Sequence, residues 1–95
     1  MTIELDLGLT VCTQAFNELL AKVDPQEIAN IANRHKQGDW GDTPEDDCEL
    51  NNHNVSNNTG YVMSSFTLAE TKVWVHTVLG EKHERITTFM LPSDY

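Results

Sequence analysis

The stretch "YVMSSFTLAETKVWVHTVLGEKHERITTFML", residues 61–91, decides the fold of this chain. It contains three runs rich in β-branched and aromatic residues, at 61–69, 72–79 and 85–91. The first two runs are separated by a short turn at Glu70 and Thr71, and the third follows the loop "GEKHE". Runs of this length with short connections predict an antiparallel three-stranded meander.

Side chains alternate along a strand, so the predicted meander has two different faces. One face is expected to carry Val62, Phe66, Leu68, Val73, Val75 and Leu79. The other face is expected to present Tyr61, Met63, Trp74, His76 and Val78. Both faces bear large apolar groups, and three short helices can cover only one of them. Self-association is the simplest cover for the second face, so a homodimer is expected.

The residues before the meander predict an N-terminal strand and a first helix. Apolar and polar residues alternate over 2–9, which predicts a half-buried strand. Its inward residues are Ile3, Leu5, Leu7 and Leu9. Thr13 is a suitable N-cap for a helix whose apolar residues recur at helical spacing. These apolar residues are Ala15, Phe16, Leu19, Leu20 and Val23.

Two further helix starts precede the meander. Asp24 followed by Pro25 predicts a second helix that ends near Gly38. Its apolar stripe is Ile28, Ile31, Ala32 and His35. "TPED" at 43–46 repeats the start signal for a third, asparagine-rich helix, in which Cys48, Asn51, Asn52 and Val55 can face inward. The 95 residues therefore predict one α+β domain, with the helices packed on one face of the sheet.

The charge balance excludes some partners. The chain has 15 acidic and 6 basic residues and a net charge of −9. Direct binding to nucleic acid or anionic lipid needs clustered Lys and Arg, and this sequence has no such cluster. A basic protein partner is permitted, including one that itself binds nucleic acid.

Other patterns bear on the cellular compartment. The sequence contains no run of the ~20 apolar residues that a membrane span needs. Its start, "MTIELDLGLT", lacks the basic and apolar regions of a secretory signal, so a cytoplasmic location is expected. Cys12 and Cys48 have no redox or metal-ligand spacing and are expected to be reduced and partly buried, without a disulfide. No cofactor is expected.

The acidic stretch 35–53, "HKQGDWGDTPEDDCELNNH", is the first candidate site. Its carboxylates could bind a metal, yet their spacing does not fit a calcium loop, and its His and Cys fit zinc poorly. Turn and cap chemistry explains more of the stretch. Asp39 and Asp42 can accept from backbone amides, and Glu45 and Asp46 suit the first turn of a helix. Trp40 is expected to bury its ring, with its N–H bonded to an acceptor.

Several of these residues resemble a family of short bacterial proteins carried on plasmids and integron gene cassettes. The resemblance rests on His35, the "GDWGD" loop at 38–42 and the acidic pair Glu45–Asp46. It continues through Ser64–Phe66, Lys72–Thr77 and the "TTFMLPSDY" of Thr87–Tyr95. It covers the chain from residue 35 onwards and is least clear at the "GEKHE" loop and Arg85. The resemblance implies an α+β fold and mobile-element ancestry, and it implies no particular activity.

Three functions compete on the sequence alone. The first is a non-enzymatic acidic module that binds or inhibits a basic, nucleic-acid-handling protein. The second is a small metal-independent ribonuclease, whose candidate groups are His35, His53, His76, His83, Arg85 and Lys72. The third is a small-ligand pocket at the sheet, lined by Trp74, His76, Tyr61 and Phe66. The first is favoured, with candidate binding residues His35, Asp39, Trp40, Asp42, Glu45, Asp46, Trp74 and His76.

Overall fold

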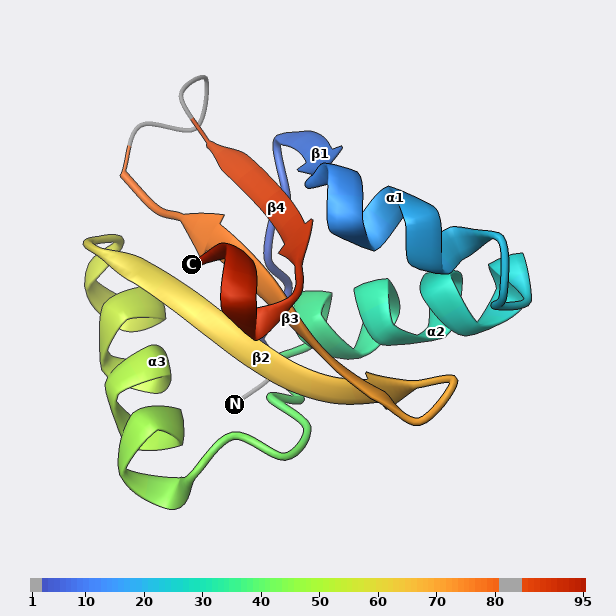
Figure 1. Ribbon diagram of the computed structural model, residues 1–95. Coiled ribbons are helices and arrows are strands. Elements are labelled where there is room, and N and C mark those ends of the chain that lie inside the picture. The colour runs from blue at the N-terminus through green and yellow to red at the C-terminus, as the bar shows by residue number, and fades with distance from the viewer. Residues whose placement is uncertain (1–2, 81–84) are drawn as a thin grey trace.

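A computed structural model describes residues 3–80 and 85–95 of the chain (Figure 1). Its elements are β1 (Leu9–Cys12), α1 (Gln14–Leu20), α2 (Pro25–Lys36), α3 (Glu45–Asn57), β2 (Tyr61–Leu68), β3 (Thr71–Val78), β4 (Ile86–Met90) and the 3-10 helix η2 (Pro92–Asp94). Thr2, at the start of the predicted strand, and most of the "GEKHE" loop, including His83, lie outside the described residues. The α+β class is confirmed.

The sheet is mixed, with the strand order β1-β4-β3-β2. β2, β3 and β4 form the predicted antiparallel meander. β1 adds to the outside of β4 in a parallel register, which the sequence analysis did not predict. The meander's turn is Ala69–Glu70, one residue earlier than predicted, because Leu68 pairs directly with Thr71. Both turn residues have positive φ, 48° and 63°, as a two-residue turn that follows the twist of a hairpin requires.

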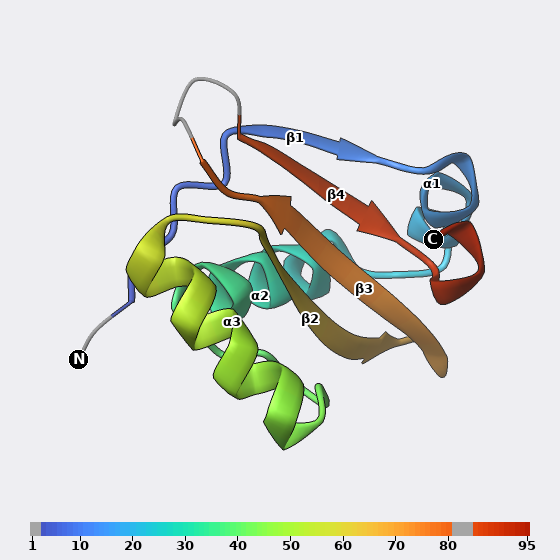
Figure 2. The ribbon, with the colours of Figure 1, turned by 90° about the vertical axis from the view of Figure 1, so that its left-hand side faces the viewer.

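The main core lies between α1, α2 and one face of the sheet (Figures 1 and 2). It is built from Phe16, Leu19, Val23, Ile31, Phe66, Leu68, Val73, Val75 and Phe89. The predicted caps of both helices form, because the Thr13 hydroxyl accepts from Phe16 N at 3.3 Å and Asp24 accepts from Gln26 N at 2.8 Å. The predicted division of side chains between the two sheet faces is confirmed for this face.

The third helix is placed differently from the prediction. α3 lies along the edge strand β2 and does not lie over the centre of the sheet (Figure 2). Its N-cap is Pro44, and Thr43 does not cap it. The Thr43 hydroxyl instead donates to Trp40 O at 2.7 Å, so this side chain closes the preceding loop. The expectation that all three helices pack on one face is therefore only partly right.

The predicted N-terminal strand over 2–9 is wrong in its position. Ile3, Leu5 and Leu7 do turn inward, where they pack in a second cluster around Trp40. Gly8 has φ +64°, in the left-handed region. This conformation interrupts the extended chain, so the residues that point inward before Gly8 do not continue as the inward residues of the strand after it. A Cβ at Gly8 would lie 2.3 Å from Arg85 O, so the chain must pass β4 closely at this point. As a result the strand begins at Leu9, which is 64% exposed and not buried as predicted.

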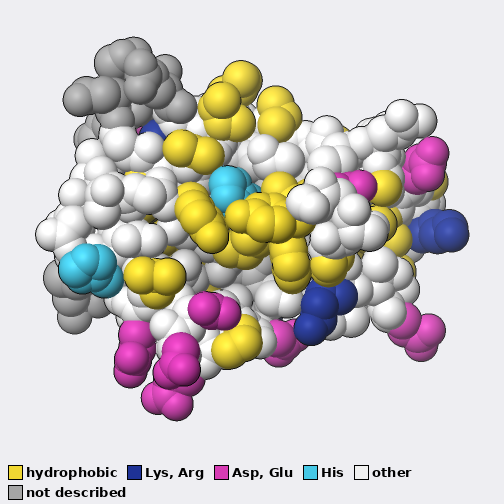
Figure 3. All heavy atoms as spheres, turned by 60° about the vertical axis from the view of Figure 1, so that its left-hand side comes forward, with side chains coloured by type: hydrophobic (Ala, Val, Ile, Leu, Met, Phe, Trp, Pro, Cys, Tyr) yellow, Lys and Arg dark blue, Asp and Glu magenta, His cyan; other side chains and the backbone are white. Residues whose placement is uncertain are grey.

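The second face of the sheet is partly covered by the C-terminus. η2 brings Tyr95 against Trp74 and His76, with ring centroids 5.7 and 6.0 Å apart. Tyr61 stacks on His76 at 4.8 Å. Figure 3 shows hydrophobic side chains gathered over this open face, with acidic side chains at one border. The predicted two-faced apolar sheet is confirmed, and its self-association stays a prediction.

Candidate functional site

The "GDWGD" loop is anchored by its tryptophan. Trp40 is 5% exposed, and its indole N–H donates to Asn52 Oδ1 at 3.0 Å, as the sequence predicts. Asp39 is held by its neighbours, because it accepts from Arg34 Nε at 2.7 Å and from Gly41 N at 3.0 Å. The hydrogen bond from Arg34 lowers the pKa of the Asp39 carboxyl. Two of the predicted binding residues, Asp39 and Trp40, therefore shape the loop.

The same loop and α3 together occupy the free edge of β2. Asp42 N donates to Ser65 O at 2.7 Å, and Ser65 N donates to Trp40 O at 3.2 Å. Two residues earlier in β2, the Asn51 side chain bonds both backbone groups of Met63. Its Nδ2 donates to Met63 O at 2.9 Å, and its Oδ1 accepts from Met63 N at 3.3 Å. The loop and an asparagine side chain thus make the hydrogen bonds that a neighbouring strand would make. This arrangement explains the polar helix, and the sequence analysis did not detect it.

Removing the Asn51 amide is expected to destabilise the fold. Asn51→Ala leaves the backbone N–H of Met63 without a partner on the β2 edge, while its C=O keeps only the 3.3 Å hydrogen bond from the Thr43 hydroxyl. An unsatisfied buried group costs about 1–3 kcal/mol, so we expect the free energy of unfolding in urea to fall by about 1–3 kcal/mol. Asn57→Ala, which removes an exposed bond to His53 O within the same helix, is the matched control and should cost less than about 1 kcal/mol. Equal losses would show that the β2 edge does not need this amide.

His35 belongs to a buried polar chain and not to an exposed site. The side chain is fully buried, and its Nδ1 bonds the Ser64 hydroxyl. Its Nε2 lies 2.8 Å from Thr77 Oγ1, which lies 2.7 Å from Thr87 Oγ1. Thr87 Oγ1 donates to Leu7 O at 2.6 Å. Burial lowers the pKa of His35 to about 4, so the ring is neutral near pH 7.

The proton order along this chain follows from its last member. Leu7 O is a carbonyl and can only accept, so the Thr87 hydroxyl donates its single proton to it. Thr87 must then accept from Thr77, and Thr77 must accept from His35 Nε2–H. Neutral His35 consequently carries its proton on Nε2 and accepts from Ser64 at Nδ1. The imidazole therefore ties α2 to β2 and β3 through buried hydrogen bonds.

The structure does not gather a ribonuclease-like site among the described residues. His35 lies beneath the sheet, and His76 lies on the opposite, open face beside Tyr61. His53 is exposed on α3. The Arg85 guanidinium donates hydrogen bonds to Asp6 O at 3.1 Å and to Asn58 Oδ1 at 2.6 Å. The three described histidines therefore do not meet in one site that could supply both a general acid and a general base.

A groove of about 400 Å³ lies between α3 and the open face of β2 and β3. Its apolar lining comes from Tyr61, Met63 and Trp74 on the sheet and from Leu50, which is 54% exposed on α3. Phe66, which the sequence analysis placed with Tyr61 and Trp74, is buried on the other face with the Arg34 guanidinium 4.7 Å from its ring centre. Neighbouring residues of a strand face opposite ways, and this parity separates Phe66 from the groove.

Polar groups line the same groove. Asp42 and Asp47 contribute carboxylates, and Lys72 contributes an ammonium group near the β2–β3 turn. Ser65 is 6% exposed, and its Oγ has no hydrogen-bond partner among the described residues. A buried hydroxyl without a partner costs about 1–3 kcal/mol, which a bound ligand could recover. Of the acidic residues predicted as binding groups, Asp42 lines the groove, whereas Glu45 and Asp46 are exposed in the first turn of α3.

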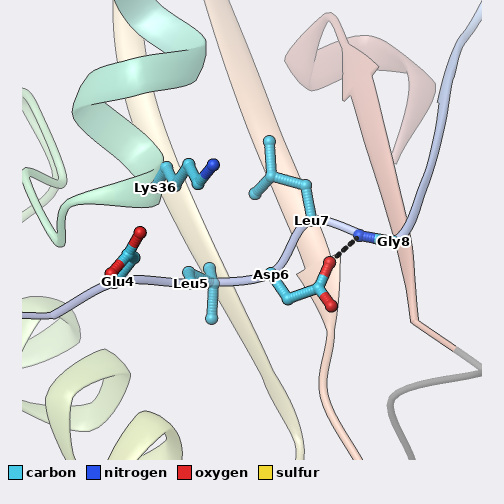
Figure 4. A pocket seen from close by; sticks show the side chains of 6 residues that line it. All are labelled: Glu4, Leu5, Asp6, Leu7, Gly8 and Lys36. Carbon is cyan, nitrogen blue, oxygen red and sulfur yellow. Dashed lines mark hydrogen bonds between the residues drawn. The ribbon is translucent and has the colours of Figure 1, made fainter.

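A second hollow, of about 460 Å³, lies beside the N-terminal segment (Figure 4). Figure 4 shows the Asp6 carboxylate turned to Gly8 N, to which it is bonded at 3.0 Å, and Lys36 extending from the end of α2. The remaining lining comes largely from one extended stretch of chain, including Glu4.

In the described part of the chain, no three His, Cys, Asp or Glu side chains are grouped so as to hold a metal ion. The groove between α3 and the sheet is therefore the better candidate site.

Comparison with models of protein families, with characterised proteins and with solved structures finds no match for this chain. Among residues 3–80 and 85–95, no helix combines the length and the apolar character needed to cross a bilayer. Cys12 and Cys48 are free, and Cys12 is exposed and not partly buried as predicted, because it lies on the edge strand β1.

Proposed function

We propose that this chain is a non-enzymatic binding module that takes a basic segment of a partner protein in the groove between α3 and the open sheet face. The observation that carries this proposal is the combination of an aromatic lining, at Tyr61 and Trp74, with carboxylates at Asp42 and Asp47. Such a groove selects a side chain that has both an apolar part and a positive charge, and arginine and lysine have both. The aliphatic stem of either residue packs on apolar surface while its charged end reaches a carboxylate.

Physical estimates support a cationic occupant. A cation held over an aromatic ring gains about 0.5–2 kcal/mol, depending on how far it is desolvated. The Ser65 hydroxyl offers one more hydrogen bond at the lining of the groove. The net charge of −9 attracts a basic protein over longer distances and accelerates its encounter. Lys72, at the turn end of the groove, is suited to a backbone carbonyl or carboxylate of the bound segment.

The partner class follows from the same chemistry. Basic segments with exposed arginine and lysine are what nucleic-acid-handling proteins present to phosphates. An acidic groove competes for those side chains, which suits a module that inhibits or recruits such a protein. The resemblance to mobile-element proteins agrees with this class. Direct contact of the groove with nucleic acid is disfavoured, because its carboxylates repel phosphates.

The test uses a fluorescent peptide that alternates arginine and leucine, and the same peptide with glutamate in place of arginine. We expect binding of the arginine peptide by fluorescence anisotropy and none of the glutamate peptide. Asp42→Asn with Asp47→Asn should weaken binding by about tenfold or more. The matched control is Glu45→Gln with Asp46→Asn, which removes the same charge from the same region outside the groove.

The outcomes separate the groove from general attraction. Equal weakening by the two double variants would show that net charge alone holds the peptide, and the proposal would fail. Absence of binding to the wild-type chain at low salt would also reject it. Tight binding of acetyl-arginine amide alone, without added affinity from the leucines, would favour a small-ligand pocket over a protein-binding groove. That alternative is supported by the volume of about 400 Å³, which lies in the range of small-molecule sites.

A further inference from the structure

The two edges of the sheet are treated in opposite ways. The β2 edge is occupied by the 40–42 loop and by Asn51, as described above. The β1 edge lies on the far side of the sheet from α3 (Figure 2). All four residues of β1 are exposed, including Leu9 at 64% and Val11 at 41%. An exposed edge strand is a template for another strand, and proteins usually protect it with charges, proline or a bulge.

The backbone of β1 offers a defined set of free groups. Leu9 N donates to Arg85 O at 3.1 Å, and Thr13 N donates to Phe89 O at 3.0 Å, so odd-numbered residues direct their backbone groups towards β4. In a strand the intervening residues direct theirs the opposite way. Thr10 and Cys12 therefore present their N–H and C=O groups outward along the edge.

The charge pattern indicates what can approach this edge. Residues 7–17, "LGLTVCTQAFN", contain no charged side chain, although 22% of the chain is charged and its net charge is −9. Two copies of so acidic a molecule repel each other over most of their surfaces. At this uncharged edge they can meet without opposing like charges. Leu9 and Val11 also lie beside Ile86 and Thr88, so they extend the apolar open face of the sheet.

We propose that β1 pairs antiparallel with β1 of a second copy about a twofold axis. Thr10 then exchanges both backbone bonds with Cys12 of the partner subunit, and the two Val11 side chains meet as a non-hydrogen-bonded pair. A register shifted by two residues would use either Gly8, whose N–H is already bonded to Asp6, or Gln14, which is in α1. Only the Thr10–Cys12 register uses all four outward backbone groups of each copy.

The dimer joins two four-stranded sheets into one continuous sheet and covers the exposed Leu9 and Val11. It leaves the groove free, because the groove lies beside β2 at the opposite edge. Each dimer would present two grooves. The dimer and the proposed peptide binding are therefore independent, and failure of one leaves the other standing.

Disulfide trapping tests the register. In the Cys12→Ser, Cys48→Ser background, Val11→Cys places two thiols on a non-hydrogen-bonded pair, about 4.5 Å apart between Cα atoms. That spacing is within disulfide reach. Thr10→Cys in the same background is the matched control, because its two copies would lie diagonally at about 7–8 Å. We expect mild oxidation to give covalent dimer with Val11→Cys and little with Thr10→Cys.

Sedimentation equilibrium of the untagged wild-type chain tests the association itself. We expect a monomer–dimer equilibrium whose dissociation constant rises by about tenfold or more in Val11→Lys, which sets like charges opposite each other. Val11 is an exposed edge residue, and circular dichroism of the variant should match that of the wild type. A wild-type chain that stays monomeric up to about 1 mM would overturn the proposal. Equal trapping of both cysteine variants, or a dimer unaffected by Val11→Lys, would do the same.

Discussion

Replacing Gly41 by alanine is expected to lower the free energy of unfolding by about 2–5 kcal/mol. Two costs add at this position. Gly41 has φ +64°, a conformation that costs a residue with a Cβ about 1–2 kcal/mol. The new Cβ would also lie 2.1 Å from Ser65 O and 2.8 Å from the Phe66 ring, so the loop must leave the β2 edge. Urea denaturation followed by circular dichroism measures the loss.

Gly80→Ala is the matched control for that substitution. Gly80 also has a positive φ, +109°, but a Cβ there would meet no atom of the described residues within 4 Å. We expect this control to show the conformational cost of a positive φ, about 1–3 kcal/mol, without the clash. If the two alanine variants lose the same stability, close packing of the "GDWGD" loop against β2 contributes nothing to stability. The interpretation that this loop replaces a neighbouring strand at the β2 edge is then wrong.

Acidification is the second large expected effect, and His35 makes the largest contribution to it; burial also lowers the pKa of the half-buried His76. The pKa of this residue falls from 6.5 to about 4 on burial, so between these values the unfolded chain binds the proton and the folded chain does not. Stability is therefore fully present above about pH 6.5 and is lost as the pH falls towards 4. The pKa difference corresponds to about 3 kcal/mol at 1.36 kcal/mol per pH unit.

His35→Gln provides the comparison, because its amide can still donate and accept but does not titrate. We expect the variant to be less stable than the wild type at pH 7 and to lose much less stability between pH 6.5 and 4. Carboxylates such as Asp39, whose pKa is lowered by Arg34, contribute at lower pH in both proteins. Parallel pH profiles of the two proteins would exclude His35 as the source. The His35 imidazole resonances of the wild type should show the neutral Nε2–H form at pH 6.5 and change towards the imidazolium only as the pH approaches 4.

Local patterns predicted most of the elements correctly. The alternation in 61–79 identifies the hairpin and its two faces, and the caps at Thr13 and Asp24 locate two helix starts, because these signals act over a few residues. The prediction failed where one residue reverses a pattern. Gly8 turns the chain over, so the alternation of Leu5 and Leu7 ends before the strand that actually pairs. Periodicity does not reveal such a reversal.

The candidate site was only partly predictable, for a related reason. Trp40 was correctly expected to anchor its loop, and Trp74 was correctly expected on the open face, since both follow from side-chain chemistry and strand parity. The roles of Asn51 and Ser65 depend on which edge of β2 is left unpaired, and that is a matter of strand order. His35 was named among the candidate binding residues because the hydroxyl groups that bond its ring come from distant strands, and the sequence does not show that they meet it.

The amino-acid sequence by itself determines the helices, the meander, the two apolar sheet faces and the acidic character of this chain. Each of these features depends on neighbours within a few positions or on a simple sum of charges. The tertiary structure alone decides that β1 joins β4, that the loop and Asn51 stand in for a strand beside β2, and that a groove opens between α3 and the sheet. These features arise from contacts between segments far apart in the chain. Their partners are chosen by packing and by the need to satisfy buried backbone groups, which no local pattern encodes.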